Sequence, residues 1–152
     1  GQPFTLLAVR IVVGGLFVYH GIDKFDAGIS MIEGMFTSWG VPAPGFTAPL
    51  TAISEIAGGL ALMAGIGTRL AGMVLGVVML GAIAFVKADL GLISSEPMPG
   101  AELDLAYLAG LVTLVAFGPG RLSVDALIGL DGTGHAEADM APAGRRAMAT
   151  TH

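Results

Sequence analysis

The sequence predicts an all-α integral membrane protein, a four-helix bundle with a short interfacial amphipathic helix between its first two membrane helices. Charged residues make up 12% of the 152-residue chain and hydrophobic residues 54%, whereas soluble globular domains carry about 25% charge. Four apolar segments each approach the ~17–25 residues that a helix needs to cross a bilayer. The 24 glycines fit the same class, because glycine is more frequent in membrane helices than in soluble ones.

The four predicted spans differ in the charges that they carry. Arg10 interrupts the first, Glu55 lies within the second, and Glu102 and Asp104 begin the fourth, whereas the third has no charge at all. A soluble bundle with unusually apolar helices is the alternative, and the uncharged third segment argues against it. In order, the spans run from about Phe4 to Ile22, Pro49 to Ile66, Leu70 to Val86 and Ala101 to Phe117.

The stretch FDAGISMIEGMFTSWG, between the first two spans, has the pattern of an amphipathic helix. Five apolar residues recur at steps of four and three, which places them on one helix face: Phe25, Ile29, Ile32, Phe36 and Trp39. We expect this helix to lie in the membrane interface with Trp39 at headgroup level. It either covers the mouth of the bundle, which is the favoured interpretation, or forms a lid over a lateral entrance for a lipid-like ligand.

The basic residues predict the orientation. Arg10, Arg69 and Arg121 fall on one side of a four-span protein, and the positive-inside rule makes that side cytoplasmic. We therefore expect a multi-pass protein of the plasma membrane with both termini in the cytoplasm. Residues 1–130 form the predicted transmembrane domain, and residues 131–152 form a polar, flexible cytoplasmic tail.

Several kinds of function are excluded by composition. The chain has no cysteine, which removes disulfides, thiolate metal sites and iron–sulfur clusters. A single histidine lies within the predicted bundle, too few for a bis-histidine haem, and we expect no metal site. The net charge of −5 argues against a nucleic-acid partner.

Ionisable residues within the spans are the candidate functional residues, because each costs a few kcal/mol to insert. Folding four helices up and down gathers most of them at the outer end of the bundle. His20 and Lys24 are four residues apart and share a helix face, with Phe17 one turn below. Lys87, Glu102, Asp104 and Tyr107 reach the same end.

Two questions about the carboxylates stay open at the level of sequence. Glu102 and Asp104 lie about 200° apart around a helix, so only one of them can face the bundle axis. Glu55 is too deep to hydrate freely, and must be neutral or paired with one of four cations: Arg10, His20, Lys24 or Lys87. Taken singly, the other charges have plain structural explanations, such as lysines that snorkel to the headgroups.

Several motifs resemble the DoxX family of small four-helix membrane proteins. The first helix carries R-x6-F-x2-H-G-x2-K from Arg10 to Lys24. The match continues through G-V-P at 40–42, E-I-A-G-G at 55–59, G-I-G-T-R at 65–69, E-L-D-L-A-Y-L at 102–108 and G-P-G-R-L-S-V-D at 118–125. The resemblance implies the same four-helix membrane bundle. Related members are named as membrane subunits of thiosulfate:quinone oxidoreductase, and others are linked to redox stress or membrane-protein assembly.

The leading hypothesis is a DoxX-like membrane subunit of a quinone-linked redox complex, with a polar site near the outer leaflet. It would be at most one subunit of an oxidoreductase, since the chain holds no redox centre of its own; quinone is the candidate cofactor, and none is bound covalently. The expected partners are the lipid membrane and either other membrane subunits or further copies of the chain. The candidate catalytic residues are His20, Glu55 and Glu102, the ligand-binding residues Phe17, Lys24, Lys87 and Tyr107, and the structural polar residues Arg10 and Arg69.

Two other functions compete with this hypothesis. The alternative is a non-enzymatic scaffold or assembly subunit of a larger membrane complex, in which the buried charges are structural. A small transporter is disfavoured, because the sequence shows neither inverted repeats nor broken helices.

Overall fold

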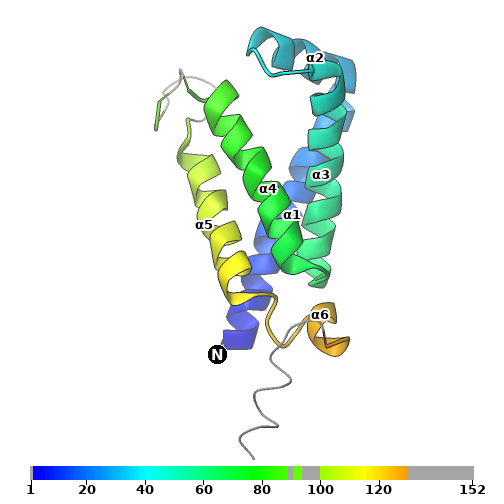
Figure 1. Cartoon of the computed structure of the whole chain (residues 1–152), viewed down its shortest axis with the longest axis vertical. Helices are drawn as coiled ribbons and strands as arrows, with labels where there is room; N and C mark the ends of the chain where they lie inside the picture. The colour runs from blue at the N-terminus through cyan, green and yellow to red at the C-terminus, as the bar shows by residue number, and fades with distance from the viewer. Residues whose placement is uncertain (1, 89–90, 94–99, 130–152) are drawn as a thin grey trace, which may run out of the picture.

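The computed structural model describes residues 2–88, 91–93 and 100–129, and every regular element within these ranges is helical (Figure 1). The predicted tail, residues 131–152, lies outside the described residues. The elements are α1 (Gln2–Ala27), α2 (Ile29–Ser38), α3 (Pro44–Ala64), α4 (Thr68–Gly81), a π-helical turn η1 (Ala82–Val86), α5 (Glu102–Phe117) and α6 (Val124–Leu127).

Three helical segments are long and apolar enough to cross a membrane: Phe4–Ala27, Pro44–Ala64 and Thr68–Val86. Two predicted boundaries were wrong. The first helix continues past Ile22 to Ala27, and α3 begins at Pro44 instead of Pro49. Proline has no backbone N–H, but an N–H in the first helical turn has no intrahelical acceptor in any case. Pro44 can therefore start the helix without the loss of a hydrogen bond. The fourth predicted span corresponds to α5, which has 16 residues.

α1, α3, α4 and α5 pack side by side around one apolar core, whose largest fully buried members include Phe17, Leu62, Leu75, Leu111 and Leu114. α2 lies across one end of these helices, and α6 lies at the opposite end with the N-terminus (Figure 1). We call these the cavity end and the Arg10 end, after the features described below.

Glycines let α1 and α3 pack with their backbones in close approach. A Cβ atom built on Gly14 would lie 2.6 Å from the Gly59 carbonyl oxygen, and one built on Gly21 would lie 2.8 Å from the Ala52 carbonyl oxygen. Real Cβ atoms do not come so close, so these contacts exist only because side chains are missing, as is common between membrane helices. Gly14 and Gly21 therefore permit the close packing of α1 against α3.

α3 and α4 meet at the Arg10 end and separate toward the cavity end. Their connecting turn holds Gly65 and Gly67 with φ angles of +73° and +53°, a conformation that glycine adopts without strain. Leu75 is seated over Gly58, where a Cβ atom would lie 2.9 Å from the leucine Cγ. Beyond this contact the two helices diverge beneath α2 (Figure 1). This divergence makes room for the cavity described next.

Candidate functional site

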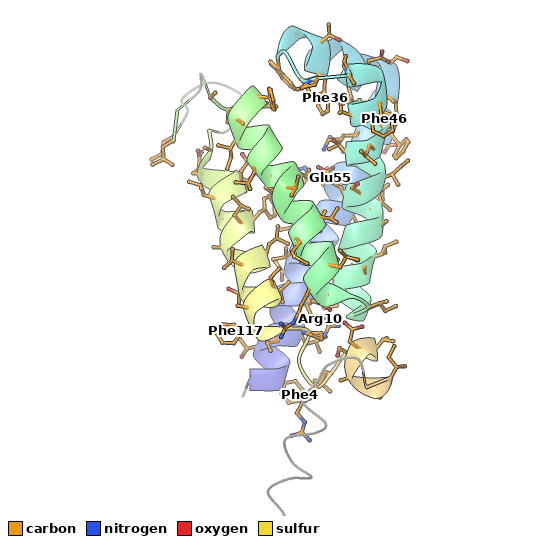
Figure 2. The ribbon with its side chains drawn as sticks, in the orientation of Figure 1. Phe4, Arg10, Phe36, Phe46, Glu55 and Phe117 are labelled. Atoms are coloured by element: carbon orange, nitrogen blue, oxygen red, sulfur yellow. The ribbon has the colours of Figure 1, made fainter. Side chains whose placement is uncertain are left out.

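A cavity of about 810 Å³ occupies the cavity end, bounded by α1, α3, α4, η1 and α5 and roofed by α2. Most of its lining is apolar, including three residues on the inner face of α2 and the residue that follows the helix: Ile32, Met35, Phe36 and Trp39. Figure 2 shows Phe36 at the roofed end and Glu55 between the helices below it. The volume lies within the range of about 300–1,000 Å³ that is common for small-molecule sites.

An ion pair joins α1 to α3 at the polar side of the cavity. Lys24 Nζ lies 2.6 Å from Glu55 Oε2, and Glu55 is 3% exposed whereas Lys24 is 21% exposed. Of the four cations that sequence reasoning offered to Glu55, the structure selects Lys24. A carboxylate this deeply buried needs such a countercharge to remain ionised. Partial exposure of the lysine gives the pair a route for exchange with solvent.

A second polar pair joins α1 to α5. His20 Nε2 lies 3.1 Å from the Tyr107 hydroxyl oxygen, and which group donates depends on the histidine tautomer. The Tyr107 ring packs against Phe17, with ring centroids 5.1 Å apart. His20, Tyr107, Phe17 and Lys24 all line the cavity, so the structure brings these predicted residues together.

Asp104, and not Glu102, faces the helix bundle. Asp104 is 7% exposed and lines the cavity, whereas Glu102 is exposed and does not belong to the described lining. Glu102 was a predicted catalytic residue, and its position on the outer side of α5 does not support that role. The buried positions of α5 recur at steps of three and four: Asp104, Tyr107, Leu111 and Leu114.

One oxygen of Asp104 lacks a hydrogen-bond partner. Its Oδ2 is buried and meets no donor among the described residues. Such an atom is costly in an apolar environment, and in native proteins it commonly marks a place where a ligand or a water completes the hydrogen bonding. The unpaired oxygen belongs to a residue that lines the cavity of about 810 Å³.

Lys87, a predicted ligand-binding residue, follows η1 and lines the same cavity. Sequence reasoning missed Asp23, which also lines the cavity, and the contribution of α2. The apolar face of α2 was recognised from its periodicity, but periodicity alone could not show what that face covers.

The two predicted structural arginines lie far from the cavity. Arg10 is 1% exposed and donates four hydrogen bonds at the Arg10 end (Figure 2). Its acceptors are the carbonyl oxygens of Leu62, Met63, Pro119 and Leu122, at 2.7–2.9 Å. Arg69, by contrast, is exposed in the first turn of α4.

Asp125 is a second buried charged residue at the Arg10 end. Its carboxylate accepts hydrogen bonds from the backbone N–H groups of Gly67, at 2.8 Å, and Thr68, at 3.1 Å. These donors lie at the N-terminus of α4, where the helix dipole favours a negative charge. In the sequence, Asp125 stands out only as the last residue of the motif at 118–125.

The cavity combines aromatic and apolar walls with hydrogen-bonding and proton-exchanging groups at one side. It could hold a flat, largely apolar molecule that carries a few polar atoms, and could exchange protons with it through His20, Tyr107 or the carboxylates. Within the described ranges, no three metal-binding side chains gather into a potential metal site.

Comparison with known proteins gives one family and several relatives. The DoxX family model matches residues 5–88. "Uncharacterized membrane protein Rv3486" of Mycobacterium tuberculosis is 35% identical over 131 residues, covering 81% of this chain and 80% of the relative. "Putative oxidoreductase CatD" of Bacillus subtilis is 30% identical over 122 residues, covering 80% and 85%. An uncharacterized protein of Haemophilus influenzae is 34% identical over 126 residues, covering 82% and 90%. No solved structure matches the chain.

Proposed function

This chain belongs to the DoxX family of membrane proteins, and from that premise we propose that it binds a membrane quinone as a subunit of a quinone-linked redox complex. The observation that carries the proposal is the cavity of about 810 Å³, with its polar groups on one side and apolar walls elsewhere. A quinone has the matching form, since its ring bears carbonyl oxygens and its tail is hydrocarbon.

The polar side chains would bind the ring and handle protons. The Tyr107–His20 pair is suited to hydrogen-bond a carbonyl oxygen, and the Lys24–Glu55 pair is suited to exchange protons with solvent. Asp104 Oδ2, which lacks a donor among the described residues, would bind a hydroxyl hydrogen of the reduced ring. The proposal assigns electron donation to a partner subunit, because the chain has no cysteine to hold an iron–sulfur cluster. The name of the Bacillus subtilis relative is in keeping with redox chemistry.

We propose a membrane arrangement in which α5 is the fourth span. A 16-residue helix is about 24 Å long, so α5 would cross most of the hydrocarbon layer as a fourth span, with α2 in the outer interface. Arg10, Arg69 and Arg121 lie toward the Arg10 end and make it cytoplasmic by the positive-inside rule. The cavity would then open in the outer leaflet of the plasma membrane.

One observation favours a second candidate, a scaffold subunit without a ligand. Glu55 is already paired with Lys24, as expected if the buried charges only hold helices together. The unpaired Asp104 oxygen is what this alternative leaves unexplained, and the binding experiment below separates the two.

Quinone binding can be followed through the fluorescence of Trp39, which lines the cavity and is the single tryptophan of the chain. The protein in detergent micelles is titrated with decylubiquinone, and a tryptophan octyl ester in the same micelles gives the quenching due to partition alone. We expect saturable quenching of Trp39 above that background. Quenching that only matches the octyl ester, without saturation, would contradict quinone binding.

A pair of tyrosine variants tests whether binding uses the polar groups. Tyr107→Phe removes one hydroxyl and keeps the ring that packs on Phe17, and we expect affinity to fall about tenfold for the loss of one buried hydrogen bond. Tyr19→Phe is the matched control, because Tyr19 is exposed next to His20 and is not part of the described cavity lining. Equal affinities for the two variants would contradict the assigned role of Tyr107.

A further inference from the structure

The wall of the cavity between α3 and α4 differs from the wall that carries the charges. Its residues are apolar or small and uncharged, and several are also exposed at the outer surface of the molecule, Val77 to 69% and Leu50 to 46%. Residues that line a cavity and reach the surface mark the place where the cavity opens. We call this opening the tail groove, and its members are Leu50, Thr51 and Ser54 of α3 and Val74, Val77 and Gly81 of α4.

We propose that the tail groove holds the isoprenoid tail of the ligand and admits the ligand sideways from the bilayer, with Gly81 setting the width of the entrance. This inference rests on the proposed function, and it adds the position of the tail and the route of entry. The head group would lie against Tyr107, His20 and Asp104, and the tail would leave between α3 and α4 into the lipid.

The positions of the polar and apolar groups determine which way the tail of a bound ligand points. The ionisable side chains of the lining come mainly from α1 and α5, apart from Lys87 after η1 and Glu55, which lies on the α3 side that faces α1. The end of the bundle is roofed by apolar side chains of α2, Phe36 among them, and by Trp39 directly after that helix. Toward α3 and α4 the lining is free of charge and also reaches the surface, so an isoprenoid chain attached to a bound ring can leave there while its apolar surface stays out of polar surroundings.

Gly81 is the one member of the tail groove that has no side chain. A Cβ atom built on Gly81 would meet nothing within 4 Å, so the space beside it is open and a larger side chain would not clash with the protein. The π-helical turn η1 begins at the next residue, and Lys87 N–H closes it by a hydrogen bond to the Ala82 carbonyl oxygen at 3.0 Å. Such turns within a helix occur frequently at functional sites.

The test fills the groove and leaves the head-group site untouched. Gly81→Leu adds a side chain where space is open, and Gly15→Leu is the matched control, since Gly15 lies in α1, also meets nothing within 4 Å and is not among the cavity-lining residues. Both variants replace a helical glycine with a better helix former. Far-UV circular dichroism and gel filtration first establish that each variant folds like the wild type.

Three probes are titrated against Trp39 fluorescence: the ubiquinone head group without a side chain, the same head group with four isoprene units, and a doxyl-labelled stearic acid that has a tail and no quinone. We expect Gly81→Leu to weaken both tailed probes about tenfold or more, while the tail-less head group changes less than about twofold. Gly15→Leu should leave all three affinities unchanged.

The outcomes separate this inference from the proposed function. Wild-type affinity of Gly81→Leu for the tailed quinone would overturn the tail groove and leave quinone binding intact. Equal weakening of tailed and tail-less quinone would also overturn it, because Gly81 would then act on the head group. Saturable, Gly81-sensitive binding of doxyl stearate without any quinone binding would support the groove and contradict the quinone. Failure of all three probes to saturate would overturn both.

Discussion

The two ends of the helix bundle both bury charged side chains, but they differ in how far those charges are hydrogen-bonded, although the Arg10 end also leaves the hydroxyl oxygen of Thr68 without a partner among the described residues. At the Arg10 end, one guanidinium donates to four backbone carbonyl oxygens, and Asp125 accepts from two backbone N–H groups. At the cavity end, Glu55 has a partly exposed partner, and Asp104 keeps an oxygen without a donor among the described residues. Two equally buried aspartates, Asp125 at 5% and Asp104 at 7% exposure, therefore differ in their hydrogen bonding.

The difference indicates what each end is for. Where backbone groups are the partners of a buried charge, the charge fixes the chain and is not available to a ligand. A cavity with an unpaired acceptor gives up stability, since an unsatisfied buried polar group costs about 1–3 kcal/mol. Burial of a charge alone does not distinguish structure from function in this protein, whereas the presence or absence of partners does.

The largest expected effect comes from Arg10→Ala. It leaves four carbonyl acceptors without their donor in a buried site, and we expect the free energy of unfolding to fall by at least about 3 kcal/mol. Unfolding in SDS-containing mixed micelles, followed by circular dichroism, measures it. Arg69→Ala is the control, because Arg69 is exposed and its loss should change stability by at most about 0.5 kcal/mol. Similar stability of the two variants would contradict a structural role specific to Arg10.

Substitution of the two buried aspartates, one at each end, should change stability by an intermediate amount and sharpen the comparison. Asp125→Asn replaces an acceptor of the α4 N-terminus with a donor, and we expect it to cost about 1–2 kcal/mol of stability. Asp104→Asn should change stability by about 0.5 kcal/mol or less, or stabilise the protein, since it removes a poorly satisfied buried charge. In the Trp39 assay, Asp104→Asn should weaken binding of reduced decylubiquinol about tenfold. The two ends would be energetically alike if the two variants lost equal stability.

The smallest expected effect is the coupling between Lys24 and Glu55. Lys24→Met and Glu55→Gln are each measured alone and together, and the double-mutant cycle gives the interaction energy. Because Lys24 is 21% exposed, we expect about 1 kcal/mol, well below the strength of a fully buried pair.

Activity gives a separate readout for Glu55. If the pair works in proton exchange, Glu55→Gln should abolish quinone turnover of the purified complex while the complex stays assembled. Loss of assembly with the same variant would favour the scaffold function, and normal assembly with normal turnover would contradict both roles.

Much of the fold could be predicted because lipid imposes strong local rules. Long apolar segments predicted the three candidate spans, and periodicity predicted α2 within the loop. The family resemblance is confirmed by the match over residues 5–88. The misplaced boundaries at Ile22 and Pro49 arose because a helix can continue past the end of its apolar segment and can start on a proline.

The candidate site was only partly predictable. His20, Lys24 and Phe17 could be placed together because one helix face carries all three, and this needs nothing beyond the helical repeat. The choice between Glu102 and Asp104 could not be made, because both are acids in the first turn of the same helix. The partner of Glu55 was equally open, since four cations lay within conceivable reach.

The sequence by itself determined that this chain enters a membrane as helices and that ionisable groups gather near one end, because both follow from hydropathy and helical spacing. Tertiary structure alone decided which way α5 rotates, which cation reaches Glu55 and where α3 and α4 separate. These depend on close packing between segments distant in sequence, such as Gly14 against Gly59 and Gly58 against Leu75. Such contacts fix how each helix is rotated about its own axis and how far it is shifted along its neighbours. The local pattern of residues carries no information on either.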